Sequence, residues 1–106
     1  MLALSRRIGE AIRIGDDFIL EVLDLERHMV MLELERPDPD FDRSQWLVVH
    51  RQAGEEFQVA EDIRVQINRI TGGIVRLGID APSIVEIVRA ELEQHPDELQ
   101  AAKASP

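Results

Sequence analysis

The chain has no cysteine, no tyrosine and only one lysine among its 106 residues. Without thiols there is no disulfide, no thiolate metal site and no cysteine nucleophile. Long hydrophobic runs are also missing, since no stretch approaches the roughly 18 apolar residues of a membrane span. The opening segment lacks the apolar centre of a secretory signal. We therefore expect a cytoplasmic protein without membrane contact.

Basic residues are scarce as well. Asp and Glu number 21 against 12 Lys and Arg, which gives a formal net charge of −9. This balance argues against nucleic-acid binding by bulk electrostatics, although a local patch can still be basic. No nucleophile–base pair or Gly-rich phosphate loop is present, and the three histidines show no ligand spacing. We expect no enzyme activity, no metal and no cofactor.

What the chain does contain is an internal repeat with a period of 45 residues. The match needs no gap, and the apolar positions coincide along both copies. The identical pairs are Leu2/Leu47, Arg6/Arg51, Gly9/Gly54, Glu10/Glu55, Asp17/Asp62, Val30/Val75, Leu32/Leu77 and Pro37/Pro82. Both copies therefore use one pattern of buried positions.

Each copy alternates apolar and polar residues in short runs separated by turn residues, which predicts β-strands. The expected strands are residues 2–6, 11–14, 18–25 and 29–35 in the first copy, and 46–51, 57–60, 63–70 and 74–79 in the second. Between the copies, residues 36–45 contain two prolines and three aspartates, a composition that disfavours a strand. We expect Trp46 to be a packing residue.

Residues 83–92 allow two interpretations. Ser83 and Glu86 form a capping-box pattern after Pro82, and the apolar residues fit one helical face. The same stretch is rich in β-branched residues and directly follows a turn, which favours a strand. Propensity alone slightly favours the helix.

Four segments resemble the carbon storage regulator A family of small bacterial RNA-binding translational regulators. The opening Met1–Glu10 matches the family's first strand almost residue by residue, and Ile14–Asp16 resembles its next turn. Val75–Pro82 resembles the fourth strand and turn, and Val85–Glu91 the fifth strand. The resemblance implies a strand from Ile84 to about Arg89, followed by a helix from about Ala90.

Family members are single five-stranded units that dimerise by exchanging strands. Each RNA site lies between the first strand of one subunit and the fifth strand of the other. The resemblance therefore implies a mainly β fold of two interlocked units, a tandem-fused pseudo-dimer forming a sandwich or barrel. The expected division is 1–37 first repeat, 38–45 acidic linker or degenerate fifth strand, 46–92 second repeat, and 93–106 C-terminal helix or flexible tail.

The resemblance also implies one composite site for a GGA element in an RNA loop. The implied RNA-binding residues are Leu4, Ser5, Arg6, Arg7, Val85, Ile87, Val88 and Arg89. Arg89 is the main candidate because Arg suits guanine and phosphate, whereas Val88 replaces the family's usual His. The opposite site would combine Val49–Gln52 with residues 40–45, where Asp40 and Asp42 repel phosphate. That site is expected to be degenerate.

Two functions remain open at this point. The first is a post-transcriptional regulator, a monomeric pseudo-dimer whose partner is mRNA or a small regulatory RNA and which a protein antagonist could control. The alternative is a degenerate acidic family member that does not bind RNA and acts as a protein-binding module or as an antagonist of ordinary members. The charge of −9 and Val88 favour the alternative, and Leu4–Arg7 with Arg89 favour RNA binding. If no RNA binds, these arginines simply pair with Glu10, Glu86 or Glu91 on a solvated face.

Overall fold

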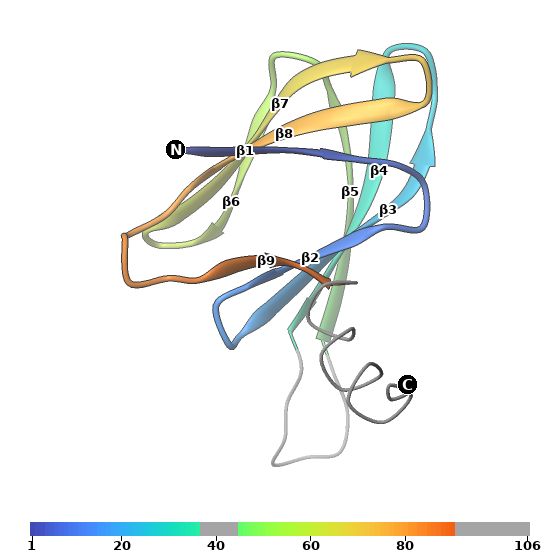
Figure 1. Cartoon of the computed structure of the whole chain (residues 1–106). Helices are drawn as coiled ribbons and strands as arrows, with labels where there is room; N and C mark the ends of the chain where they lie inside the picture. Colours follow the sequence, from blue (N-terminus) through green and yellow to red (C-terminus); the bar gives the residue numbers. More distant parts are fainter. Residues whose placement is uncertain (37–44, 91–106) are drawn as a thin grey trace, which may run out of the picture.

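The computed structural model describes residues 1–36 and 45–90, and within them the chain is almost entirely β. This confirms the mainly β prediction, whereas the helix expected within residues 93–106 lies outside the described residues. None of the described residues forms a helix that is long and apolar enough to cross a membrane. The described strands are β1 (Leu2–Arg6), β2 (Ala11–Ile14), β3 (Phe18–Leu25), β4 (Met29–Arg36), β5 (Gln45–Gln52), β6 (Glu56–Ala60), β7 (Ile63–Thr71), β8 (Ile74–Asp80) and β9 (Ile87–Arg89) (Figure 1).

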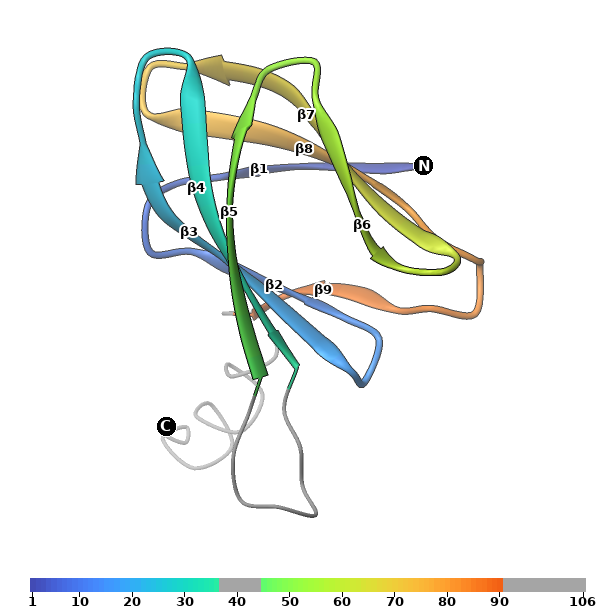
Figure 2. The same cartoon turned by 180° about the vertical axis from the view of Figure 1, so that it is seen from behind.

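The strands form two antiparallel sheets that face each other (Figures 1 and 2). One sheet has the order β1-β8-β7-β6, and the other has the order β5-β4-β3-β2-β9. The first sheet thus takes β1 from the first half of the chain and its other strands from the second half. The second sheet takes β5 and β9 from the second half and β2–β4 from the first. The two halves therefore interlock by exchanging strands.

Strand pairing repeats with the same shift of 45 residues that relates the two halves of the sequence. In the first sheet Leu4 is opposite Leu77, and in the second sheet Val49 is opposite Leu32. The tight turns also correspond, because Gly9 N–H donates to the Val22 carbonyl at 2.8 Å and Gly54 N–H donates to the Ile67 carbonyl at 2.7 Å. The repeat in the sequence thus corresponds to a repeat in strand pairing and in backbone hydrogen bonds.

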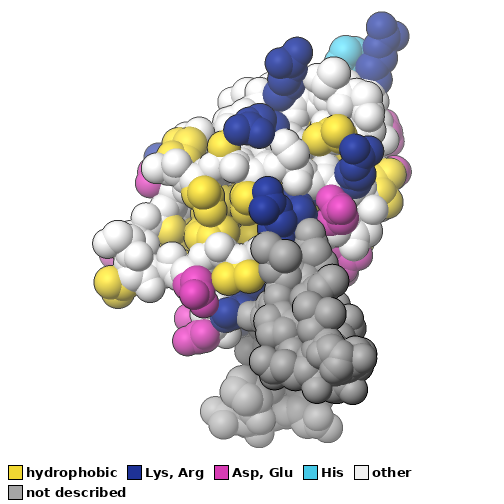
Figure 3. All heavy atoms as spheres, in the orientation of Figure 1, with side chains coloured by type: hydrophobic (Ala, Val, Ile, Leu, Met, Phe, Trp, Pro, Cys, Tyr) yellow, Lys and Arg dark blue, Asp and Glu magenta, His cyan; other side chains and the backbone are white. Residues whose placement is uncertain are grey.

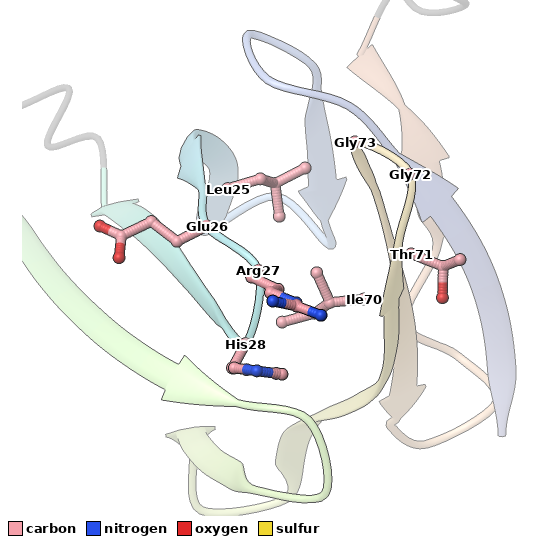
Figure 4. A pocket seen from close by; sticks show the side chains of 8 residues that line it. All are labelled: Leu25, Glu26, Arg27, His28, Ile70, Thr71, Gly72 and Gly73. Carbon is pink, nitrogen blue, oxygen red and sulfur yellow. The ribbon is translucent and has the colours of Figure 1, made fainter.

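A pocket of about 460 Å³ shows the same correspondence (Figure 4). It lies between the β3–β4 turn and the β7–β8 turn, and its lining residues are counterparts 45 positions apart. Leu25 and Ile70 supply its apolar lining, while Arg27 and His28 come from the first turn. The two halves meet here at equivalent turns.

The core lies between the two sheets and is shared by both halves. Alternation along the strands places apolar residues inward, where burial of apolar surface stabilises the fold. The fully buried side chains are Ile12, Ile14, Leu20, Val22, Val30, Leu32, Val65, Ile67, Val75, Leu77 and Ile79. Because they form one cluster, neither half encloses a core of its own.

Gly9 and Gly54 provide a matched test of this equivalence. Their φ angles are +87° and +93°, in a region that L-residues with a Cβ atom rarely adopt, and a Cβ added to either would meet nothing within 4 Å. Gly9→Ala and Gly54→Ala should therefore each lower the free energy of unfolding by about 1–2 kcal/mol, from backbone strain alone. Urea unfolding measures this, with the exposed neighbour Ala53→Ser as the control. A loss in only one of the two glycine variants would contradict the equivalence.

Four expectations need correction. The fifth strand predicted from Ile84 to about Arg89 is confined to Ile87–Arg89, because Ser83–Val85 form a turn closed by Val85 N–H donating to the Pro82 carbonyl at 2.9 Å. The helical interpretation is wrong for Ile87–Arg89, which pair with β2. Trp46 is 58 % exposed and is not a packing residue of the described structure. Gln45, placed in the linker, is the first residue of β5.

Candidate nucleic-acid interface

β1 and β9 are edge strands of different sheets, and strand exchange brings both to one face of the molecule (Figure 1). A pocket of about 220 Å³ opens where the start of β1 approaches the segment leading into β9. Met1 and Leu2 line it from one side, and Val85 and Ile87 from the other. Two segments that are more than 80 residues apart in the sequence therefore form one surface.

β9 is held on β2 by backbone pairing and by one arginine. Arg89 is opposite Ile12, and Gly15 N–H donates to the Glu86 carbonyl at 2.7 Å. The Arg13 guanidinium lies 3.3 Å from the Glu86 carboxylate, so this acidic group is paired within the strand edge. Glu86, three residues before Arg89 in the sequence, therefore has its own cation.

Arg6 points into the protein, although it was expected to contact RNA. Its side chain is 5 % exposed, donates to the Ser5 carbonyl at 2.8 Å and to the Ala11 carbonyl at 3.2 Å, and lies 3.7 Å from the Glu10 carboxylate. The contact with Ala11 ties β1 to the strand that carries β9. In this structure Arg6 positions the two edges relative to each other.

Arg7 and Arg89 are the exposed basic residues of the face, and Ser5 is half-buried. Leu4, expected as an apolar platform, is only 8 % exposed, and the accessible apolar surface comes from Leu2 and the lining of the pocket. Val88 is half-buried. In Figure 3 apolar side chains gather in the middle of this face, with basic side chains beside and above them. The combination offers stacking surface together with cations.

Arg76 on β8 is a further basic residue that sequence reasoning did not select. It is exposed, is opposite Ser5 in the sheet, and donates to the Ser5 hydroxyl oxygen at 3.2 Å. The sequence shows that both residues occupy outward positions of their strands. Only the register of β1 on β8 reveals that they are neighbours.

The opposite end of the molecule repeats half of this arrangement. On β5, Val49 is buried and Arg51 donates to the His50 carbonyl at 2.8 Å, as Arg6 does to Ser5. The Arg51 guanidinium also lies over the Phe57 ring at 5.7 Å. However, no strand within residues 1–36 and 45–90 pairs with the outer edge of β6, where the equivalent of β9 would lie. Asp40 and Asp42 lie outside the described residues.

Comparison of the sequence with known protein families shows the family to which the chain belongs. The model of the CsrA global regulator protein family matches residues 1–39 and again 46–98. The chain therefore belongs to the CsrA family, and it matches the family in two separate segments.

Individual relatives align with about half of the chain. The translational regulator CsrA of Pseudothermotoga lettingae is 50 % identical over 48 residues, which are 45 % of this chain and 63 % of that protein. The CsrA of a Nocardioides species is 45 % identical over 60 residues, covering 57 % and 72 %. That of Thermotoga maritima is 38 % identical over 61 residues, covering 56 % and 74 %. The match thus spans less than two thirds of the first of these relatives. No solved structure gives a significant match.

Proposed function

We propose that this protein is a post-transcriptional regulator that binds a GGA-containing single-stranded loop of mRNA or small regulatory RNA. The observation that carries the proposal is that the β1 edge, with Ser5 and Arg7, and the β9 edge, with Arg89, lie on one face of the molecule, beside a pocket lined by Leu2, Val85 and Ile87. Unstacked bases in RNA loops are read on their edges and stack on apolar or planar groups. Strand edges with arginines beside apolar surface suit that mode of recognition.

We further propose that the chain is a tandem-fused pseudo-dimer with one competent site. The exchange of strands between the halves, the constant shift of 45 residues in their pairing, and the two family segments support this proposal. The proposed division is 1–37, 38–45, 46–92 and 93–106. A single chain then supplies both strands of the site, so the protein acts as a monomer. The proposed location is the cytoplasm.

The site residues follow from exposure. Arg89 and Arg7 are the main proposed RNA contacts, with Ser5 and Arg76 beside them and Val85, Ile87 and Val88 as apolar or backbone contacts. Leu4 and Arg6, which are buried, shape the edge. With a net charge of −9, general attraction to phosphates is weak, so affinity depends on this local set and on contacts to bases.

The competing function is a family member that no longer binds RNA and instead binds a protein. The net charge of −9 and the apolar Val88 favour it. The two functions differ in one direct observation, which is binding of a GGA hairpin by the wild-type chain.

Isothermal titration with a GGA hairpin at low salt should show one RNA bound per chain. Changing GGA to CCA in the same hairpin should weaken binding about 30-fold or more, because each of the two wrong bases costs about 1–3 kcal/mol. No binding of the GGA hairpin at low salt would favour the protein-binding alternative. Two bound RNAs per chain would contradict the single site but leave RNA binding intact.

A further inference from the structure

The four-stranded sheet ends at β6 with an edge that no described strand covers. Ile67 N–H donates to the Glu55 carbonyl at 2.8 Å and Phe57 is opposite Val65, so the Glu55 carbonyl and the backbone groups of Phe57 face β7. By alternation, Glu56 and Gln58 direct their N–H and C=O groups away from the sheet. Such an edge is a template for a further strand.

The equivalent edge of the other sheet shows what such a strand looks like. There β9 pairs antiparallel with β2, so that Val88 is opposite Arg13 and Arg89 is opposite Ile12. The counterparts of Ile12 and Arg13, 45 positions later, are Phe57 and Gln58 on β6. A short antiparallel strand therefore fits the edge of β6 at Phe57 and Gln58 in the manner of β9, before the register of β6 on β7 shifts between Gln58 and Ala60.

A second observation lies on β5, beside β6 on the face seen in Figure 2. Trp46, Leu47 and Val48 are 58 %, 54 % and 46 % exposed, a run of three large apolar residues. The counterparts of Trp46 and Leu47 are Met1 and Leu2, which line a pocket together with residues of the segment leading into β9. The apolar run thus occupies the position at which a counterpart of β9 would supply a cover.

The charges around β6 differ from those around β2. Arg13 on β2 contacts Glu86 at 3.3 Å, whereas its counterpart on β6 is the neutral Gln58. Ala11 on β2 is replaced by Glu56 on β6. These two exchanges turn one positive charge on the edge into one negative charge, although the Glu56 carboxylate also lies 3.8 Å from the Arg64 guanidinium. With the exposed Glu55 and Glu61 beside it, the edge of β6 still favours a strand that carries basic residues.

We propose that β6 together with Trp46–Val48 binds an extended basic segment of another protein, which adds to the sheet as a fifth strand. Its apolar residues alternate with polar ones, so that one face covers the apolar run. A second copy of this chain fits poorly, because β6 paired antiparallel with β6 about Gln58 places Glu55 opposite Glu61 at both ends. The proposal is independent of RNA binding, since it uses the opposite edges of the molecule.

Trp46 is the only tryptophan of the chain, so its fluorescence reports occupation of this surface directly. The probes are two synthetic peptides without tryptophan, residues 82–90 of this chain and the same peptide with Glu86→Lys. We expect a saturable blue shift of the Trp46 emission, because the added strand shields the indole from water. The Lys peptide should bind about two- to fivefold more tightly than the Glu peptide, as for an exposed ion pair.

Substitutions at Gln58 identify the edge that is used. Gln58→Pro removes an N–H that points away from β7, so it should abolish the shift while unfolding by urea stays cooperative. Gln58→Arg restores the charge found on β2, so the Glu peptide should then bind more tightly than the Lys peptide. This variant tests the proposal even if the proline variant does not fold. An absent shift with both peptides, or an unchanged order in Gln58→Arg, would overturn the proposal. So would emission that depends on the concentration of the protein alone, because it would indicate self-association.

Discussion

Arg89→Ala is expected to bind the GGA hairpin about 5- to 150-fold more weakly than the wild type, because a well-placed arginine contact to a base contributes about 1–3 kcal/mol. Arg89 is exposed at the third position of β9, and its backbone pairs with Ile12. The substitution removes the guanidinium from the β9 edge and leaves this backbone pairing in place. Fluorescence anisotropy of a labelled hairpin at fixed salt measures the loss.

The matched control is Arg27→Ala, which removes another exposed arginine, from the β3–β4 turn. Both variants change the net charge by the same amount, so a general electrostatic effect would weaken binding equally. Arg89→Ala should reduce the ratio of the affinities for the GGA and CCA hairpins, whereas Arg27→Ala should leave this ratio unchanged. Equal affinities of wild type and Arg89→Ala would remove β9 from the proposed site.

Leu77→Ala is expected to lower the free energy of unfolding by about 2–5 kcal/mol, since the site is fully buried and a cavity remains. Leu77 lies on β8 opposite Leu4, at the centre of the four-stranded sheet. Its counterpart Leu32 lies on β4 in the other sheet and is equally buried. Because the two halves share one core, either substitution should destabilise the whole molecule.

The measurement is urea unfolding followed by Trp46 fluorescence and by circular dichroism. For Leu77→Ala and Leu32→Ala, both probes should give one coincident transition at lower urea than in the wild type. Ile84→Ala is the control, because Ile84 is 91 % exposed and its loss should change stability by less than about 0.5 kcal/mol. Two separate transitions would mean that the halves are independent domains.

The strand positions could be predicted from the sequence because alternation and turn residues are local signals. Gly72 and Gly73, for example, lie between the expected strands 63–70 and 74–79, and both have the positive φ that a tight turn between strands favours. Residues 83–92 could not be resolved by local signals, because a capping box and β-branched residues coexist there. The pairing of Ile87–Arg89 with β2 decides it, and that partner is more than 70 residues away.

The candidate site was predictable only in part. Alternation along β1 places Arg6 on the same face as Leu4, so the pattern alone predicts that Arg6 is buried. The family resemblance instead implied that Arg6 contacts RNA. Arg76 could not be found without the register between β1 and β8. The exposure of Trp46 was also hidden, because Trp46–Val49 is apolar throughout and gives no alternation to distinguish inside from outside.

Because the strands are exchanged within one chain, the order in which they leave the ribosome determines when each strand can pair. β1 is made first, yet its partner β8 ends at Asp80, about 4–15 s later at 5–20 residues per second. During that interval β2, β3 and β4 can pair with one another, while β1 waits without a neighbouring strand. β9 is made last and completes the surface beside β1. An unfinished chain therefore lacks the proposed RNA site until its last described strand has emerged.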